Sequence, residues 1–127
     1  VERASVWLLD ETGTKIKCLD LFEKSVNQHS EGLEIAAADY PAYFQALQQD
    51  EAIAADDART DPRTFEFAPS YLIPLGIVSM LDIPIRLRGQ TAGVICLEQI
   101  GSQRHWTAED QNFARSLADL VSLAVEA

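Results

Sequence analysis

Apolar and polar residues alternate in several short segments of the chain, which is the pattern of half-buried β-strands. Residues 3–10 and 15–22 form one pair of such segments, joined by a turn that contains glycine. Residues 79–87 and 91–100 form a second pair, also joined by a short turn with glycine. The sequence therefore predicts two β-hairpins, one near each end of the chain.

Two longer segments follow the period of an α-helix instead. The first starts at Pro41, which suits a first helical turn because its missing N–H has no partner there. Its large apolar residues share one stripe: Tyr40, Tyr43, Phe44 and Leu47. The second follows Thr107, an N-cap residue, with Asp110 three positions later as a capping-box partner. Its apolar face is wide enough for two contacts, the domain's own sheet and another surface.

The middle of the chain is less regular. Residues 23–34 predict a polar connection, and short strands are expected near 33–36 and at 53–55. A short helix is expected within 64–73, where prolines limit its extent. Because hairpins favour antiparallel pairing, the sequence predicts an α/β fold of the α+β type around a central antiparallel sheet of five to six strands.

Composition and charge narrow the function classes. The 127 residues are 47% hydrophobic, so residues 1–127 are expected to form a single domain with a packed core. The chain begins at Val1, in what resembles the start of a strand, and we expect it to be a piece of a longer protein. Its net charge of −10 disfavours nucleic acid as a partner. No apolar run approaches the ~20 residues that a membrane helix requires.

The two cysteines, Cys18 and Cys96, stand inside apolar strand patterns far apart in the sequence. Thiols at such positions usually act as small buried hydrophobic groups, although a redox or attachment role is the alternative. Two unpaired thiols favour the reducing cytoplasm as the location. No CxxC pair occurs and no spacing typical of a metal site is present, so no metal is expected.

Several segments, taken in order, resemble one family. They are residues 3–8, 39–44, 56–63, 76–85 and 93–98, followed by Trp106 and Glu109-Asp110. In this combined order the chain resembles the GAF domain family over nearly its whole length, short of one N-terminal helix. Any one segment alone is a weak signal, whereas the order of all of them is fairly specific.

The resemblance implies a PAS-like, profilin-like fold. Its terminal helix covers one face of the sheet, often pairing with a second copy, and short helices and loops cover the other face. It also implies a non-catalytic sensory module of a bacterial, possibly cyanobacterial, sensor histidine kinase, response regulator or diguanylate cyclase. The expected partners are a second copy of the chain, its own flanking signalling domains and an unknown small molecule.

The resemblance places a ligand pocket under the short helices, where aromatic walls and a charged group would hold a ligand. The candidate pocket residues are Tyr43, Asp56, Arg59, Phe65, Phe67, Tyr71 and Met80. For each of them, core packing or loop capping is the alternative role. The candidate dimer and relay residues of the terminal helix are Phe113, Leu117, Leu120, Val121 and Ala124.

Subfamily motifs argue against particular ligands. Residues 66–71 contain no cysteine to attach a bilin, so a covalent bilin is not expected. Glu98-Gln99 stands where relatives that bind cyclic nucleotides carry Asn-Lys, and Glu109-Asp110 inverts their Asp-Glu pair, which disfavours a cyclic nucleotide. Relatives that reduce methionine sulfoxide use several cysteines around the pocket, an arrangement that Cys18 and Cys96 do not reproduce.

Three functional hypotheses follow. The first is a sensory module without catalytic residues, which binds a small molecule and relays the signal through its terminal helix. The second is a ligand-free dimerisation module, which predicts that the pocket region is filled by its own side chains. The third is an enzyme, either a thiol-based methionine sulfoxide reductase or a hydrolase, which would require an accessible reactive group.

Overall fold

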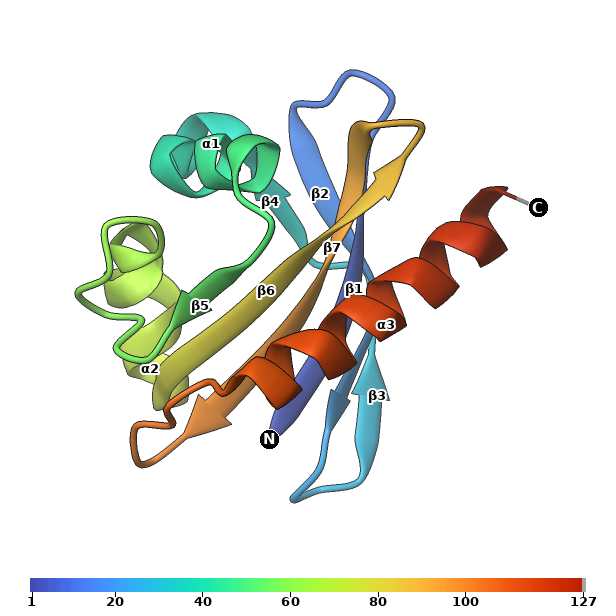
Figure 1. The fold of residues 1–127 in the computed structure, drawn as a ribbon. Helices are drawn as coiled ribbons and strands as arrows, with labels where there is room; N and C mark the ends of the chain where they lie inside the picture. Colours follow the sequence, from blue (N-terminus) through green and yellow to red (C-terminus); the bar gives the residue numbers. More distant parts are fainter. Residues whose placement is uncertain (127) are drawn as a thin grey trace.

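The computed structural model describes residues 1–126, and it contains one antiparallel sheet with helices on both faces (Figure 1). The strands are β1 (Arg3–Leu9), β2 (Lys15–Glu23), β3 (Gln28–Ser30), β4 (Glu34–Ala36), β5 (Ile53–Ala55), β6 (Ile77–Leu87) and β7 (Gln90–Ile100). Their order across the sheet is β3-β2-β1-β7-β6-β5, and β4 also pairs with β2. All neighbouring strands pair in antiparallel fashion, which confirms the predicted fold class and both hairpins.

The sheet has seven strands, and the expected number of five to six was therefore too low. The strand that the sequence did not reveal is β3, because its three residues are all exposed and carry no apolar alternation. It pairs with one part of β2, while β4 pairs with another part of the same strand. One long strand thus holds two short ones along its outer edge.

Helical segments occupy the rest of the chain. They are η1 (Ala37–Asp39), α1 (Pro41–Gln49), η2 (Phe65–Phe67), η3 (Ala68–Leu72), α2 (Ile73–Leu75) and α3 (Ala108–Glu126). The short helix expected within 64–73 is split into three pieces, η2, η3 and α2, of which η3 is a single π-helical turn. We call α1, η2, η3 and α2 together the roof, because they cover one face of the sheet, while α3 crosses the opposite face (Figure 1).

Each face of the sheet has its own core. On the roof side, Leu47, Ile53 and Leu72 are fully buried against the sheet. On the α3 side, Leu81, Ile83 and Ile85 of β6 are buried with residues of α3. Alternation from Met80 to Ile85 of β6 therefore divides its residues between the two layers, and a β-bulge between Ile77 and Ser79 places Ile77 on the roof side as well.

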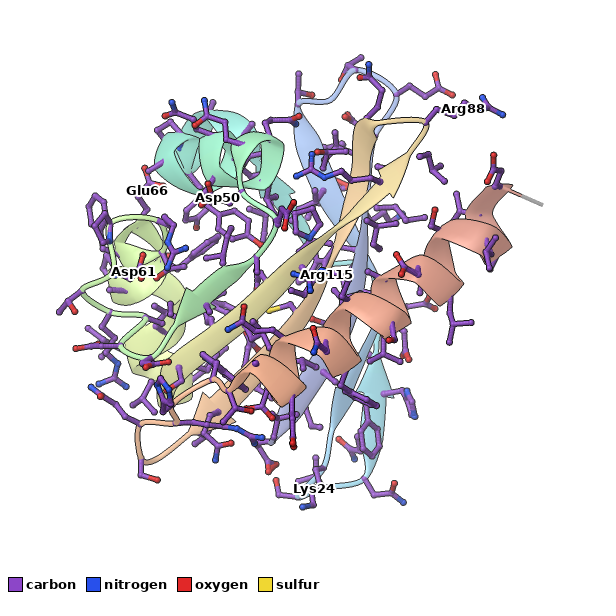
Figure 2. All side chains as sticks on the ribbon, viewed as in Figure 1. Lys24, Asp50, Asp61, Glu66, Arg88 and Arg115 are labelled. Carbon is purple, nitrogen blue, oxygen red and sulfur yellow. The ribbon has the colours of Figure 1, made fainter. Side chains whose placement is uncertain are left out.

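Glu66 joins two parts of the roof, η2 and the first turn of α1. Its carboxylate accepts hydrogen bonds from the backbone N–H groups of Ala42 (3.2 Å) and Tyr43 (3.1 Å), and Figure 2 shows Glu66 beside this helix. These N–H groups have no partner within the helix, and no side chain at its N-cap position supplies one. A residue far along the chain thus completes the helix start and holds η2 in place.

The predicted capping box at the start of α3 is confirmed. The Thr107 hydroxyl accepts a hydrogen bond from the Asp110 N–H (3.1 Å), and the Asp110 carboxylate accepts one from the Thr107 N–H (3.0 Å). Arg104 also pairs with Asp110 at 3.0 Å. Within residues 1–126, none of the helices combines the length and apolar character needed to cross a bilayer.

Gly93 lies where β7 passes close to β1. A Cβ atom added there would lie 2.1 Å from the carbonyl oxygen of Trp7, a distance that no packed structure tolerates. Only a residue without a side chain therefore fits at this point of the central strand pair.

We predict that Gly93→Ala destabilises the fold by about 3 kcal/mol or more, because the strand backbone must separate to admit the methyl group. Urea denaturation followed by circular dichroism measures this change. Gly101→Ala serves as the control, since its added Cβ meets open space and only the positive φ of 93° opposes it, at about 1–2 kcal/mol. Equal losses in both variants would contradict the close-contact explanation.

Candidate functional site

A row of buried polar side chains crosses the roof face of the sheet. Asp82 on β6 lies opposite Cys96 on β7, which in turn lies opposite Ser5 on β1. Glu98 lies opposite Arg3 across the same β7–β1 pair. All five are less than one-tenth exposed. Such a concentration of buried polar groups in the middle of a sheet requires a specific set of partners.

Arg3, Glu98 and Tyr71 form a buried triad. The Arg3 Nε donates to Glu98 Oε1 at 2.8 Å, and the Tyr71 hydroxyl donates to the same oxygen at 3.1 Å. Arg3 Nη2 also donates to the Tyr71 oxygen at 3.2 Å. Burial is the largest single influence on the pKa of Arg3 and lowers it, yet the hydrogen bonds and charges of Glu98 and Tyr71 together outweigh burial and the pKa is raised. The guanidinium therefore stays charged, and the triad joins the two central strands, β1 and β7, to the roof.

Asp82 is buried without a cation beside it. Its Oδ2 accepts a hydrogen bond from the Tyr43 hydroxyl of α1. Burial raises the pKa of Asp82 to about 7, although the Tyr43 hydrogen bond acts in the opposite direction. Among the residues described, Asp82 Oδ1 and Glu98 Oε2 are buried oxygens without an N–H or O–H donor. The Cys96 thiol beside both carboxylates offers them only a weak S–H donor.

Four of the seven candidate pocket residues converge on this region. Tyr43, Phe67 and Met80 are nearly fully buried in the roof-side core, and Tyr71 is packed against it. The rings of Tyr43 and Phe67 meet edge to face with centroids 4.8 Å apart. Side chains crowd the space between the roof and the sheet (Figure 2). The aromatic residues thus fill the space in which the sequence placed a ligand.

The other three candidates lie elsewhere. Phe65 is half exposed on the outer surface of the roof. Arg59 donates from Nε to the Ile77 carbonyl at 3.0 Å and so holds the loop after β5 against the start of β6. Asp56 faces the linker between β7 and α3. Asp56 and Arg59 thus have the alternative role foreseen for each candidate, the fixing of a loop.

The sequence pointed to the aromatic residues but not to Arg3, Asp82 and Glu98 as a site. A signal was present, because Asp82 and Glu98 are charged residues in the middle of otherwise apolar strands. A charge at an inward-facing strand position requires a buried partner or a bound group. That reasoning would have singled out both carboxylates before any coordinates were known.

A cleft of about 250 Å³ opens on the outer side of this cluster, between β4 with its preceding loop and the roof. Aromatic side chains of Tyr40, Phe67 and Tyr71 line it, and Glu34 and Asp39 lie at its rim. The Tyr40 and Phe67 rings stack with centroids 4.3 Å apart. Tyr71 both lines the cleft and donates a hydrogen bond to Glu98, so this side chain links the cleft to the buried carboxylate.

Asp56 connects the loop after β5 to the linker that precedes α3. Its carboxylate accepts hydrogen bonds from the Trp106 N–H (3.0 Å) and from His105 Nδ1 (2.7 Å). The hydrogen bond from His105 is the main reason that the pKa of Asp56 is lowered. The Ser79 hydroxyl donates to the Asp56 carbonyl and accepts from the Arg104 N–H, at 2.7 and 2.9 Å. We call these contacts the α3 junction.

Helix α3 has one covered and one uncovered apolar stripe. Ala114 and Ala118 are buried against the sheet, and Leu117 and Val121 are half-buried beside them. Phe113 (63%), Leu120 (63%) and Leu123 (66%) are exposed, and Ala124 is exposed as well. The wide apolar face predicted for the helix is therefore present, and the sheet covers one side of it, taking the small residues rather than the large ones.

Both cysteine thiols are free and buried. Burial raises the pKa of Cys18, and it raises that of Cys96 well above the usual range, with the neighbouring Asp82 and Glu98 adding to the shift of Cys96. Neither thiol is thus primed as a nucleophile. Among the described residues there is no group of three or more His, Cys, Asp or Glu side chains that could hold a metal ion.

The order of the elements, the antiparallel sheet and the α3 helix on its far face are those of one protein family. The family model of the GAF domain matches residues 1–125. The chain belongs to the GAF family. A search among curated proteins found no match.

Solved GAF structures share this fold. The GAF domain of a two-component sensor histidine kinase from Bacillus halodurans is 27% identical, with a TM-score of 0.72 over 98% of this chain and 80% of its own. The cyanobacteriochrome receptor PixJ is 19% identical, with a TM-score of 0.78 over 98% and 83%. The type II free methionine-R-sulfoxide reductase from Thermoplasma acidophilum is 20% identical, with a TM-score of 0.69 over 95% and 76%. The GAF fold is thus shared by a kinase, a photoreceptor and a reductase.

We predict that Asp82→Asn stabilises the GAF domain, and more so at higher pH. Because the pKa of Asp82 is raised from 3.8 to about 7 by folding, the wild type loses stability as pH rises through that interval. The loss is on the order of 4 kcal/mol when complete. Denaturation curves recorded from pH 4 to 8 measure the difference between variant and wild type.

The asparagine keeps an acceptor for Tyr43 and removes only the charge. The control is Asp119→Asn, which changes an exposed carboxylate on α3 and is expected to give a curve parallel to the wild type. A constant difference between Asp82→Asn and wild type across this pH range would contradict the assignment.

Asp56→Ala is predicted to loosen the α3 junction. Loss of two acceptors for the linker should cost about 1 kcal/mol and speed hydrogen exchange at the Trp106 amide. Exchange monitored by NMR measures this. Asp57→Ala is the matched control, because the Asp57 side chain makes no hydrogen bond among the described residues. Unchanged exchange at Trp106 in Asp56→Ala would argue against a coupling role for Asp56.

Proposed function

We propose that this GAF domain is a non-catalytic sensory and regulatory module of a bacterial signal-transduction protein. The parent would be a sensor histidine kinase, a response regulator or a diguanylate cyclase, and the cytoplasm would be its location, in keeping with two free thiols. The sensor kinase and photoreceptor among its structural neighbours support a signalling role. No covalent bilin and no cyclic nucleotide is part of the proposal.

The observation that carries the proposal is the uncovered stripe on α3. Phe113, Leu117, Leu120 and Ala124 are spaced four, three and four residues apart, which is the repeat of a coiled-coil seam. Three of them are exposed, although exposed apolar side chains in such a row are usually covered by a partner. We infer that two copies pair through this stripe and that flanking domains read the arrangement of the pair.

The signal would reach α3 through its junction. The loop after β5 contacts the linker through Asp56, and β7 continues directly into that linker. A ligand that favours one position of the roof would thereby favour one arrangement of the paired helices. Differential affinity for the two arrangements is all that such a relay requires.

A ligand-free dimerisation module is the second candidate. The packing of Tyr43, Phe67 and Met80 into the roof-side core favours it, because these side chains occupy the expected pocket. A thiol-based reductase is disfavoured, because the pKa of each buried thiol is raised and neither is exposed to a substrate. The two leading candidates share the paired α3 and differ in whether the roof site binds a molecule.

Leu120→Glu is predicted to weaken the dimer at least about 30-fold, because a charge would enter the apolar seam. Analytical ultracentrifugation over a concentration series measures the association constant. Asn112→Glu adds the same charge at an exposed polar position of the same helix and should leave association unchanged. A wild type that stays monomeric at the highest attainable concentration would overturn the proposal.

A further inference from the structure

The roof-side interior holds more negative than positive charge. The buried charged residues of the described chain are Arg3, Asp82 and Glu98. The single buried guanidinium is already committed, because it pairs with Glu98 Oε1, the Tyr71 oxygen and Glu23 at 3.3 Å. One oxygen of each buried carboxylate is left without an N–H or O–H donor, and only the weak S–H donor of Cys96 lies beside them. Each such buried acceptor costs about 1–3 kcal/mol when nothing pairs with it.

The cleft beside η3 is linked to Glu98 through Tyr71, which lines the cleft and donates a hydrogen bond to Glu98 Oε1, and the cleft has the features of a cation site. Three aromatic rings line it, and aromatic faces attract cations. Asp39 adds a negative charge to the lining, whereas Glu34, which also lines the cleft, is paired with Lys15 at 3.0 Å. Tyr71, the side chain between the cleft and Glu98, belongs to a π-helical turn, and such turns are frequent at functional sites.

We propose that the cleft and the two carboxylates behind it bind a small organic cation that carries N–H donors, of the guanidinium or primary ammonium class. This inference rests on the sensory role proposed above and names the ligand class of the same site. The aromatic rings flank the cation, and its N–H groups donate to the free oxygens of Glu98 and Asp82. Tyr71 turns away from Glu98 to admit it.

The chemistry of the site selects for a donor as well as a charge. A quaternary ammonium ion would satisfy the aromatic walls but would leave both carboxylate oxygens without a hydrogen bond. An anion would meet the carboxylates of Asp39, Asp82 and Glu98 with no free buried cation to receive it. A planar cation with several N–H donors can contact the aromatic rings and donate hydrogen bonds to both carboxylates at the same time.

Isothermal titration with agmatine tests the inference, because agmatine carries a guanidinium group and a primary ammonium group. Choline is the matched probe with a charge but without N–H donors. We expect agmatine to bind and choline to bind at least about tenfold more weakly. Absence of agmatine binding, or equal affinity for the two probes, would overturn the inference.

Variants of the carboxylates locate the site. Asp82→Asn and Glu98→Gln should each reduce agmatine affinity at least about tenfold, whereas Glu109→Gln, an exposed acid on α3, should leave it unchanged. If Glu98→Gln does not fold because Arg3 loses its partner, Asp82→Asn carries the test. Agmatine affinity that is insensitive to Asp82→Asn would overturn the site.

The two proposals fail separately. If agmatine does not bind but Leu120→Glu still separates a dimer, the cation site is wrong and the paired α3 stands. If agmatine binds to a chain that never dimerises, the cation site stands and the relay through paired helices is wrong.

Discussion

The ion pair between Arg3 and Glu98 is the interaction on which the rest of the structure depends. It joins residues 95 positions apart and fixes β1 against β7 in the centre of the sheet. Tyr71 of the roof donates a hydrogen bond to Glu98 and so attaches the roof to the same ion pair. Removing Arg3 would leave Glu98 buried without a counter-charge, which is far costlier than the pair itself is stabilising. Removing Glu98 would leave Arg3 only the partly exposed Glu23 at 3.3 Å. The N-terminal strand, the central strand and the roof are therefore held by one cluster.

Stability alone does not explain this cluster. A buried ion pair is often no better than well-packed apolar residues of the same volume, and Asp82 adds a carboxylate without any cation. The roof face could have been lined with the isoleucine and leucine that fill the α3 side of the same strands. Polar groups retained at such a cost are typical of sites that recognise something. This contrast between the two faces is the strongest reason to place the sensing function under the roof.

Local patterns in the sequence predicted what local forces determine. Both hairpins and the capping box of α3 depend on residues that are neighbours in the chain, so alternation and spacing revealed them. The triad could not be found in this way, because Tyr71 lies 68 residues from Arg3 and 27 from Glu98. Loop fixing was foreseen as an alternative role for Asp56, but its partners were missed for the same reason, since they lie 49 and 50 residues further on. Residues that the fold brings together from afar leave no periodic signal.

The same topology shows how the roof and α3 are physically connected. Glu98 lies two residues from the end of β7, and the linker that follows is held by Ser79 and Asp56 before α3 begins. The strand that carries the buried carboxylate therefore leads directly into the helix whose outer stripe is uncovered. A ligand-free dimer would need the stripe and the junction but would have no use for unpaired acceptors in its interior. A module that senses a molecule with N–H donors and relays its presence would use the stripe, the junction and the unpaired acceptors.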